Sequence, residues 1–421
     1  MSPPRAPSPA ELGRAIVARL DELAQISDEP GKITRLTLSP SHRRAVDRTT
    51  EWMHEAGMTT RLDALGTLIG EYPGASAGAP HLLIGSHLDS VRDAGRFDGT
   101  LGVVAAIEIV RHLQQSGKRL PFGITVLAFG DEEGVRFLST LTGSRAVAGQ
   151  FDPKILDERD EDGISRREAL RDFGCPEGDA SADWQGQNAL GFLELHIEQG
   201  PVLEAENRPL GVVTAIQGVT RGSCRVTGKA GHAGTTPMVL RQDALAAASA
   251  MILAIEGIAR DTTGLVATIG QLRVPGGAVN TIPGHVEFSL DFRSESDTLR
   301  HEAGLRIQAA IADIARNRRV EAKLYLGYEA PAAQCDGGLR QLMAEAAEAT
   351  IDKPVRLLSS GAGHDAMSFR GRIPFGMMFV RSRDGLSHHP DEFSSEADIG
   401  LAAATLFRTV LALAERHDEL N

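Results

Sequence analysis

Hydrophobic positions in the first half of the chain alternate between helical spacing and short unbroken runs. Apolar residues three or four positions apart, or a helix-capping signal, predict helices, and short apolar runs predict buried strands. The predicted helices are residues 11–26, 41–56 and 101–115, and the predicted strands are residues 81–86, 124–130 and 189–196. Strands that alternate with helices favour an α/β domain with a mainly parallel central sheet, where ligands bind at the carboxyl ends of the strands.

The pattern changes near Val213, where strands begin to alternate apolar and polar residues. The predicted order of strand, helix, strand, strand, helix, strand is typical of a small α+β sandwich. These six elements are predicted at residues 222–228, 241–258, 265–274, 285–293, 297–316 and 320–328. From Gly337 the earlier pattern returns, with strands at 355–358 and 375–380 and a helix at 396–415. We therefore predict a parent domain of residues 1–212 and 330–421, with residues 213–329 inserted into it.

The composition indicates an acidic globular protein. The chain has 44 Lys and Arg against 56 Asp and Glu, a net charge of -12, so we expect neither nucleic acid nor a membrane surface as a partner. The longest apolar stretch, residues 244–255, is too short to span a bilayer, and the first ten residues lack the apolar core of a secretory signal. Three cysteines without metal-site or disulfide spacing predict inert thiols and a cytoplasmic location.

A histidine and two acids follow the first predicted strand of this α/β domain. His87 lies at the strand end, Asp89 two residues later, and Asp98 just before the helix at 101–115. An imidazole in this place can bind a metal ion while an acid holds it in the right tautomer, a role that we predict for Asp89. Asp98 could bridge two cations with its two oxygens. The alternative is a structural histidine with a helix-capping aspartate.

Three consecutive acids, Asp131, Glu132 and Glu133, follow the strand at 124–130. Because adjacent side chains at a strand end point apart, one acid can bind a metal ion while its neighbour faces the substrate water. A metal hydrolase requires this division of labour. An exposed acidic loop is the usual explanation for such a run, but it suits this run less well, because the run follows a buried strand at the edge where ligands bind.

Two further histidines complete the candidate ligand set. His196 ends the strand at 189–196, and His388 lies in a turn-rich segment near the carboxyl terminus. Each histidine taken alone is more typical of an ordinary surface or core residue. Together with an aspartate and a glutamate they form a ligand shell that suits zinc, accepts manganese or cobalt, and leaves positions open for water.

Seven short motifs in one order extend these candidates over nearly the whole chain. They are GSHLDSV at 85–91, FDG at 97–99, EEGVRF at 132–137, ELHIEQGP at 194–201, GHAGTTPM at 231–238, SGAGHDA at 360–366, and SH at 387–388 with Pro390. In these motifs the chain resembles the M20 metallopeptidase clan, specifically its amidase, hydantoinase and carbamoylase family, which includes N-carbamoyl-L-amino acid hydrolases, allantoate amidohydrolases and β-ureidopropionases. The chain departs from the family at residues 93–95, Asp-Ala-Gly, where two glycines are common.

The resemblance implies a phosphorylase/hydrolase-like catalytic domain that holds two divalent ions in each subunit. One ion would bind to His87, Asp98 and His196, and the other to Asp98, Glu133 and His388, pairings that the spacing alone leaves open. Glu132 would act as general base and acid, and Asp89 would support catalysis. Zn²⁺ is the favoured ion, and Mn²⁺, Co²⁺ or Ni²⁺ also suits these ligands.

For the insert, the resemblance implies an α+β sandwich that serves as a lid and dimerisation domain in a homodimer. His232 would reach the partner subunit's active site and stabilise the oxyanion, whereas the alternative is a local role in its Gly-rich turn. Arg293 would bind a substrate carboxylate, although strand-end arginines are often merely solvated. The full set of residues implied at the substrate is Gln199, His232, Asn280, Arg293, Gly361, Ala362, Gly363 and His364, with Asp365 close by.

The resemblance implies hydrolysis of the linear C–N amide bond of a small-molecule ureido acid, such as an N-carbamoyl-L-amino acid or allantoate, with release of ammonia. Two alternatives remain at this stage. An aminopeptidase or dipeptidase of the same clan would share every metal ligand, and a non-catalytic metal-binding scaffold would have lost some of them. The carboxylate-binding set and the His232 motif favour the ureido-acid branch, and the complete ligand set argues against the scaffold.

Overall fold

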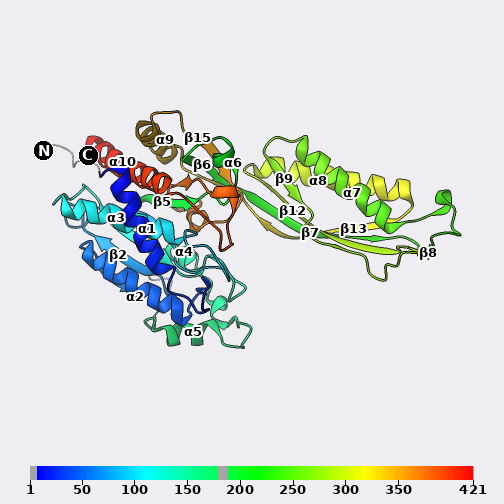
Figure 1. Cartoon of the computed structure of the whole chain (residues 1–421), viewed down its shortest axis with the longest axis horizontal. Helices are drawn as coiled ribbons and strands as arrows, with labels where there is room; N and C mark the ends of the chain where they lie inside the picture. Colours follow the sequence, from blue (N-terminus) through cyan, green and yellow to red (C-terminus); the bar gives the residue numbers. More distant parts are fainter. Residues whose placement is uncertain (1–6, 179–187, 421) are drawn as a thin grey trace. The chain divides into compact units, whose positions relative to one another are not determined.

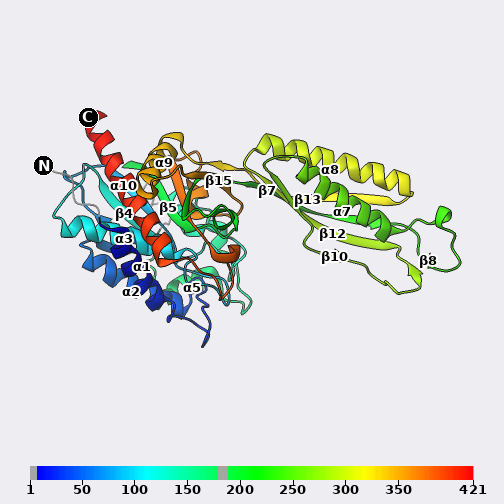
Figure 2. The same cartoon turned by 45° about the horizontal axis from the view of Figure 1, so that its top comes forward.

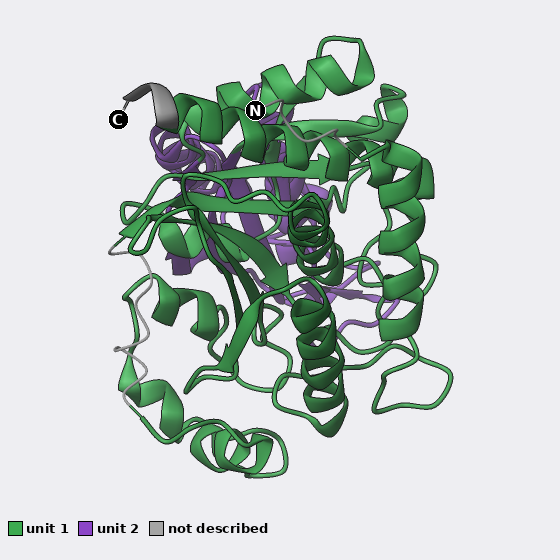
Figure 3. Cartoon of the chain, turned by 90° about the vertical axis from the view of Figure 1, so that its left-hand side faces the viewer, with its two compact units in different colours: residues 1–214, 335–421 green, residues 215–334 purple. Residues whose placement is uncertain are grey.

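The computed structural model describes residues 7–178 and 188–420, and the chain forms two compact units. Unit 1 comprises Met1–Thr214 and Cys335–Asn421, and unit 2 comprises Ala215–Gln334 (Figure 3). The insert predicted from the sequence spans residues 213–329. Each unit has its own hydrophobic core, so each is described by itself.

Unit 1 is built on a nine-stranded sheet whose central strands are parallel (Figure 1). β3 (His81–His87) pairs in parallel with β4 (Gly123–Phe129) and with β5 (Ala189–Ile197), and β5 pairs in parallel with β16 (Phe375–Val380). These strands are almost entirely buried, as expected for a parallel sheet that is covered on both faces. The prediction of an α/β fold with a mainly parallel central sheet is confirmed.

Most outer strands of this sheet are antiparallel, and the hydrophobic pattern did not predict most of them. β1 (Thr59–Leu62) pairs with β2 (Leu68–Tyr72), which pairs with β4. On the other side, β6 (Leu210–Ile216) pairs with β16 and with β14 (Ala333–Gln334), and β15 (Arg356–Ser360) pairs with β6. β1 and β14 are too short to show a hydrophobic period. β6 lies where the change of pattern near Val213 was interpreted as the start of the insert.

The long helices of unit 1 pack on the sheet and on one another. Helix α3 packs on β3, β4 and β5, while α1 packs on α3 and α10, and α10 packs on α9. Their bounds are α1 (Pro9–Leu23), α2 (Pro40–Glu55), α3 (Thr100–Gln115), α9 (Gly337–Ile351) and α10 (Glu396–Leu420). Ser39, in the predicted capping signal, accepts the backbone N–H of His42 and so caps α2.

Shorter helical turns connect these elements. They are α4 (Thr142–Val147), α5 (Arg166–Phe173), α6 (Val202–Ala205), and the 3-10 turns η1 (Pro153–Asp157), η5 (Asp365–Phe369) and η6 (Arg383–Gly385). The charged stretch 151–187 was expected to be surface loop with short helices, and η1 and α5 lie in it. Its last part, residues 179–187, lies outside the described residues.

One described helix is long and apolar enough to cross a membrane by length and composition alone. This is the Glu396–His417 part of α10, whose most apolar window has a mean hydropathy of 1.5. Of that window, 67% is buried inside the structure, as in a core helix of a globular unit. This helix was predicted at residues 396–415, but residues 244–255 were taken as the longest apolar stretch, because charged residues such as Arg408 interrupt the apolar run of α10.

Unit 2 consists of a five-stranded antiparallel sheet and two long helices (Figure 2). Its main elements are β7 (Gly218–Thr227), α7 (Ala244–Arg260), β12 (His285–Ser294), α8 (Asp297–Arg318) and β13 (Glu321–Ala330). Buried and less buried residues alternate along the whole of β12, so one face of this strand forms the core of the unit. A separate pair of short strands, β8 (Gly231–His232) and β11 (Thr281–Ile282), completes the unit.

The prediction of one continuous strand at 265–274 was wrong. The structure has two short strands there, β9 (Leu265–Thr268) and β10 (Leu272–Arg273), both paired with β12. Between them the backbone N–H groups of Gly270 and Gln271 donate to the Ser289 hydroxyl rather than to a neighbouring strand. A side-chain acceptor therefore breaks the ladder where the apolar pattern runs on.

Candidate metal centre and active site

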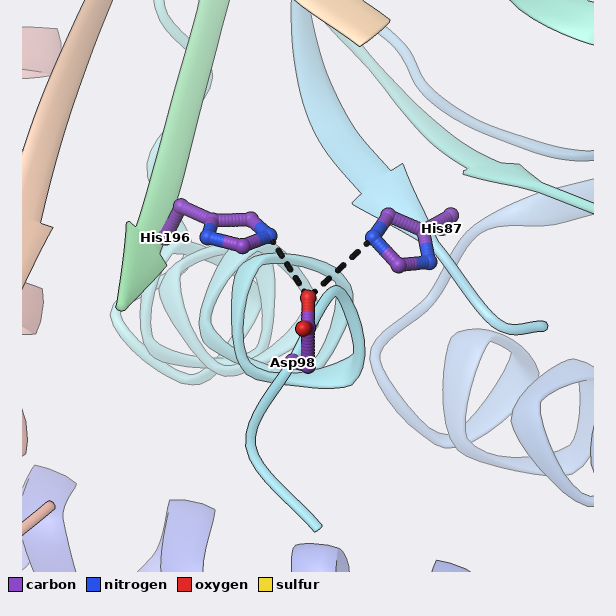
Figure 4. Close-up of side chains that lie close together, drawn as sticks. All are labelled: His87, Asp98 and His196. Carbon is purple, nitrogen blue, oxygen red and sulfur yellow. Dashed lines mark ion pairs between the residues drawn. The ribbon is translucent and has the colours of Figure 1, made fainter. Parts of the chain in front are cut away.

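Three parallel strands bring their carboxyl ends to one edge of the sheet in unit 1. His87, the last residue of β3, is in register with Phe129, the last residue of β4, so the acids that follow β4 lie beside it. His196 lies one residue before the end of β5, the other neighbour of β3. Asp98, in the turn before α3, reaches the space between the two histidines (Figure 4).

The two oxygens of the Asp98 carboxylate face different side chains. Oδ1 lies 3.1 Å from Nε2 of His196 and 3.5 Å from Nε2 of His87 (Figure 4). Oδ2 lies 3.3 Å from Nε2 of His388. One buried carboxylate is therefore shared by two sets of side chains, the arrangement that a bridging ligand requires.

Two groups of three side chains around Asp98 could each hold a metal ion. The first is His87, Asp98 and His196, and the second is Asp98, Glu133 and His388. In the second group, Oε2 of Glu133 lies 3.3 Å from Nε2 of His388. The ligand atoms of each group lie within 4.8 Å of one another. All five residues predicted as metal ligands are thus brought together, in the pairing that the resemblance implies.

A glycine makes room for the first group. The backbone of Gly99, at the start of α3, has φ 67°, which favours glycine, and a Cβ here would overlap the His87 ring. Helix α3 consequently begins without a side-chain cap. The close approach of this backbone to His87 is what lets Asp98 meet the imidazole.

The charges in the site fit divalent cations. Burial raises the pKa of Glu132 well above its ordinary value, and burial followed by the charge of Asp98 raises the pKa of Glu133 to about 7. The buried Oε1 of Glu133 has no hydrogen-bond partner among the described residues. Clustered buried carboxylates are costly unless cations balance them, so the donor set fits two divalent ions.

Asp89 contacts its neighbours differently from the prediction. Its carboxylate oxygen Oδ1 lies 3.6 Å from Nδ1 of His87, too far for a hydrogen bond, whereas its backbone carbonyl oxygen lies 3.1 Å from that nitrogen. The carboxylate instead accepts the backbone N–H groups of Glu132 and Glu133, each at 3.2 Å. Asp89 therefore orients His87 through its main chain and the acidic segment through its side chain.

Gln199, which was predicted to contact substrate, lies against Asp98. Its Nε2 donates to Oδ2 of Asp98 at 2.9 Å and to the Ser387 hydroxyl at 3.2 Å. The Ser387 hydroxyl lies 2.9 Å from the same Asp98 oxygen. The amide oxygen of Gln199 is buried and has no hydrogen-bond partner in the described part of the chain. Gln199 therefore borders the candidate metal centre.

The Gly361–Gly363 loop follows β15, and its residues are exposed or half-buried. The next residue, His364, is buried, with Nε2 2.8 Å from the Ser360 hydroxyl and its ring edge-on to His196 at 4.5 Å between centroids. Burial and the neighbouring charge of His196 hold the pKa of His364 well below its usual range. The structure thus places His364 directly behind the first candidate group.

Two acids with clear contacts at this site had no role in the sequence analysis. Glu194 accepts hydrogen bonds from the Ser86 hydroxyl at 2.8 Å and from the backbone N–H of Ala366 at 2.9 Å. It lies two residues before His196 on the same face of β5, so the two-residue period of a strand could have identified it. Glu392 accepts the backbone N–H groups of Phe97 and Asp98, and no local pattern points to it.

In unit 2, His232 and Asn280 lie on adjacent short segments. His232 pairs with Thr281 across β8 and β11, and the carbonyl of Asn280 accepts the backbone N–H of Ala233 at 2.9 Å. Both residues are exposed. Nδ1 of His232 accepts the backbone N–H of Gly234 at 3.1 Å, which places the proton of the neutral ring on Nε2.

Arg293 lies at the opposite end of β12 from this pair. Its Nε and Nη2 each lie 2.8 Å from an oxygen of Asp291, two residues earlier on the same strand. Arg221 donates to the same carboxylate at 2.8 Å. A substrate carboxylate would therefore compete with Asp291 for this edge of the guanidinium.

Comparison with known proteins places this geometry in a family. The model of peptidase family M20/M25/M40 matches residues 83–412. An N-carbamoyl-L-amino acid amidohydrolase of Geobacillus stearothermophilus is 41% identical over 96% of this chain and 99% of its own, and allantoate deiminase 2 of Glycine max is 38% identical over 94% and 89%. The crystal structure of an amidase of the hydantoinase/carbamoylase family from Burkholderia multivorans superposes with a TM-score of 0.90, at 34% identity over 96% of this chain and 98% of that one.

These matches extend over both units, and they agree with the two groups of histidine and carboxylate side chains around Asp98. The chain belongs to the M20 peptidase family and, within it, to the hydantoinase/carbamoylase branch of amidases.

Proposed function

We propose that this protein is a dinuclear metal-dependent hydrolase that cleaves the linear C–N amide bond of N-carbamoyl acids, such as N-carbamoyl-L-amino acids or allantoate, and releases ammonia. The observation that carries the proposal is the Asp98 carboxylate, whose two oxygens face two separate groups of candidate ligands. The relatives named as an N-carbamoyl-L-amino acid amidohydrolase and an allantoate deiminase support this substrate class.

The proposed ligands are His87, Asp98 and His196 for one ion, and Asp98, Glu133 and His388 for the other. Histidine nitrogen and carboxylate oxygen are ligands that zinc prefers, and manganese, cobalt and nickel also bind to them. Ions held in this way polarise a carbonyl oxygen and lower the pKa of a water molecule, and both effects are needed because two nitrogens weaken the electrophilicity of a ureido carbonyl.

Glu132 is the proposed general base and acid. It takes a proton from the attacking water and returns it to the leaving nitrogen. Burial raises the pKa of its carboxyl well above the ordinary value, and shifted pKa values are common among the acids and bases of active sites. Asp89 assists by holding the backbone N–H groups of Glu132 and Glu133, which fixes base and ligand relative to each other. For an N-carbamoyl amino acid the products are the amino acid, ammonia and carbon dioxide.

The proposed substrate contacts come from both units. In unit 1 they are Gln199, Gly361, Ala362, Gly363 and His364, which border the candidate metal centre. In unit 2 they are His232, Asn280 and Arg293. His232 suits the oxyanion, because its neutral ring carries the proton on Nε2 and can donate a hydrogen bond from there. Arg293 suits a carboxylate, which its planar guanidinium binds with two parallel hydrogen bonds.

The length of β12 supports a homodimer. Arg293 pairs with Val266 of β9 near one end of β12, whereas β8, with His232, lies beyond the other end (Figures 1 and 2). His285 and Arg293 are eight positions apart in the strand, about 26 Å at ~3.3 Å per residue. One small ureido acid does not reach both Arg293 and His232 of the same chain. We therefore propose that His232 and Asn280 act on the substrate of a second copy.

The edge of the unit 2 sheet offers a surface for this second copy. β13 is at the edge of the sheet, and Tyr325, Leu326 and Tyr328 on it are about half exposed. Leu305 on α8 is also exposed. A strand that has apolar side chains and an open outer edge favours pairing with another strand. Unit 2 would then be both dimerisation domain and lid, closing over the substrate. We also propose a cytoplasmic location, in keeping with three free cysteines.

An aminopeptidase or dipeptidase remains the alternative, since it would use the same ligands. The test is product formation by protein loaded with Zn²⁺ or Mn²⁺, offered N-carbamoyl-L- and D-amino acids, allantoate, β-ureidopropionate, ureidoglycolate and simple dipeptides. We expect ammonia from at least one ureido acid and no cleavage of dipeptides. Cleavage of dipeptides without turnover of any ureido acid would replace the proposal with the peptidase.

A further inference from the structure

A buried carboxylate joins two segments that are far apart in the sequence and meet at the second candidate group. Glu392 is only 3% exposed. Its Oε1 accepts the backbone N–H of Phe97 at 2.9 Å and that of Asp98 at 3.2 Å. Glu392 is itself four positions after His388. The side chain therefore fastens the segment with one ligand of this group to the segment with another.

The second oxygen of Glu392 reaches the Asp98 side chain through a serine. Oε2 lies 3.0 Å from the Ser387 hydroxyl, and that hydroxyl lies 2.9 Å from Oδ2 of Asp98. Ser387 immediately precedes His388 in the chain. Glu392 thus holds the backbone of Asp98 directly, and the Ser387 hydroxyl, which has one proton to donate, lies between the two carboxylates.

The neighbouring residues are arranged around this side chain. A Cβ on Gly95 would overlap Glu392, so the glycine leaves the space that the carboxylate fills. The rings of Phe97 and Phe393 meet edge to face with centroids 6.1 Å apart, which closes the junction next to it. Asp98 and His388 both lie outside regular strands, and His388 has a left-handed φ of 55°. Their mutual placement therefore depends on side-chain contacts such as these.

We propose that Glu392 is the positioning residue for the ion held by Asp98, Glu133 and His388. It sets the separation of Oδ2 of Asp98 from Nε2 of His388, now 3.3 Å, without itself being a ligand. Groups that orient metal ligands typically change metal affinity about 10- to 100-fold when they are removed. The inference rests on the proposed ligand sets and goes beyond them by assigning a function to a residue outside both.

The effect should be larger at one ion than at the other. His87 and His196 of the other group stand on β3 and β5, which are paired with each other and buried in the sheet. Their positions do not depend on the segment from Ser387 to Glu392. Asp98 belongs to both groups, whereas Ser387 adjoins a ligand of the second group alone, so loss of Glu392 should weaken the second site more strongly than the first.

The test measures metal content rather than turnover. Wild type, Glu392→Ala, Glu392→Gln and Ser387→Ala are equilibrated at fixed free Co²⁺ concentrations, and bound cobalt is determined by elemental analysis and by visible absorption. We expect wild type to bind two ions and Glu392→Ala to bind the second about 10- to 100-fold more weakly. Glu392→Gln should keep both ions, because its amide oxygen accepts the same two N–H groups and its nitrogen can donate to Ser387.

A matched control separates positioning from general destabilisation. Glu108 is also fully buried, pairs with Arg19 at 2.9 Å, and lies on α3 about 15 Å along the helix from Asp98. Glu108→Ala should lower the unfolding temperature and leave both cobalt affinities unchanged. Ser387→Ala, a smaller change, should weaken the second ion more than the first, and it keeps the test decisive if Glu392→Ala does not fold.

Three outcomes would overturn the inference while leaving the proposed function standing. In the first, Glu392→Ala or Ser387→Ala binds both ions as tightly as wild type does. In the second, Glu392→Ala lowers the affinity for both ions equally. In the third, Glu392→Ala and Glu108→Ala change the cobalt affinities equally. Wild type that binds no cobalt would instead overturn the proposed metal centre.

Discussion

The carboxylate of Asp89 holds the main chain of Glu132, accepting its backbone N–H at 3.2 Å. The other oxygen of Asp89 accepts the N–H of Glu133 in the same way. The acidic segment after β4 is thereby fixed at two successive residues, beside His87 at the end of β3. The proposed base and the proposed ligand on adjacent residues need this rigidity, because proton transfer depends on the position of the base.

Glu132→Gln removes the proposed proton carrier while preserving the size of the side chain. We expect kcat on an N-carbamoyl amino acid to fall about 10²- to 10⁴-fold, since general acid–base catalysis contributes about this much. Metal content should stay at the wild-type value because Glu132 is in neither ligand group. Steady-state ammonia release and metal analysis of the same preparation check both points. A variant that retains a large part of the wild-type kcat would remove Glu132 from the mechanism.

Arg293→Ala tests the carboxylate-binding site. We expect KM for a carboxylated substrate to rise at least about tenfold, as expected when a charge-assisted pair of hydrogen bonds is lost. Arg225→Ala is the matched control, since Arg225 lies on the neighbouring strand and also pairs with an acid of β12, Glu287, at 3.3 Å. KM should be unchanged in the control. Equal KM values for Arg293→Ala and wild type would exclude Arg293 as a substrate contact.

Mixing two inactive variants tests whether His232 serves the second subunit. His232→Ala and Glu132→Gln homodimers should each be nearly inactive. After the subunits exchange, half of the dimers are mixed, and each mixed dimer has one site with an intact Glu132 and an intact partner His232. We expect recovery of about a quarter of wild-type activity.

The control for this mixing experiment uses Glu132→Gln with His388→Ala, both changed in unit 1. Any mixed dimer of these two variants has a defect at each site, so no activity should return. Failure of the His232→Ala and Glu132→Gln pair to complement, with exchange verified by mass, would place His232 in its own subunit's site or outside both.

The protein without metal should lose stability as the pH rises. Burial, followed by the charge of Asp98, raises the pKa of Glu133 to about 7, so from about pH 4.5 to 7 the folded state binds more protons than the unfolded state. The hydrogen bond to Asp98 raises the pKa of His388 to about 9, which extends the same sign of effect from about pH 6.5 to 9. Folding stability then decreases with pH in both windows.

Thermal unfolding of chelator-treated protein at pH 5.5 and pH 8.5 measures this loss. We expect a lower midpoint at pH 8.5, and a smaller difference between the two pH values in Glu133→Gln. Added Zn²⁺ should raise the midpoint most at the higher pH, because metal binding requires deprotonated ligands. A midpoint that rises with pH in the metal-free protein would contradict the linkage.

The sequence predicts the strand ends of the site better than the contacts around them. His87, Glu133 and His196 follow or end apolar strands, and that pattern places them at one sheet edge. His388 needed the family resemblance, because nothing in its own turn distinguishes it. Glu392 is missed altogether, since its contact with Asp98 joins residues 294 positions apart. The two-residue period of β5 would have identified Glu194.

The edge strands of the fold are likewise predicted less well from the sequence than the central strands. The buried central strands have unbroken apolar runs, whereas β1 is short and half exposed and owes its place to pairing with β2. The break between β9 and β10 depends on the Ser289 hydroxyl, which belongs to another strand. Where tertiary contacts decide the structure, local periodicity does not report it.

The central claim is that two ions shared by Asp98 are needed to hydrolyse a ureido acid. Its most direct test is titration of metal-free protein with Zn²⁺ or Mn²⁺ while ammonia release from an N-carbamoyl-L-amino acid is recorded. The account predicts no activity in the metal-free protein and full activity only as the second equivalent per subunit binds. Full turnover at one equivalent, or turnover that persists in the presence of a chelator, would contradict it.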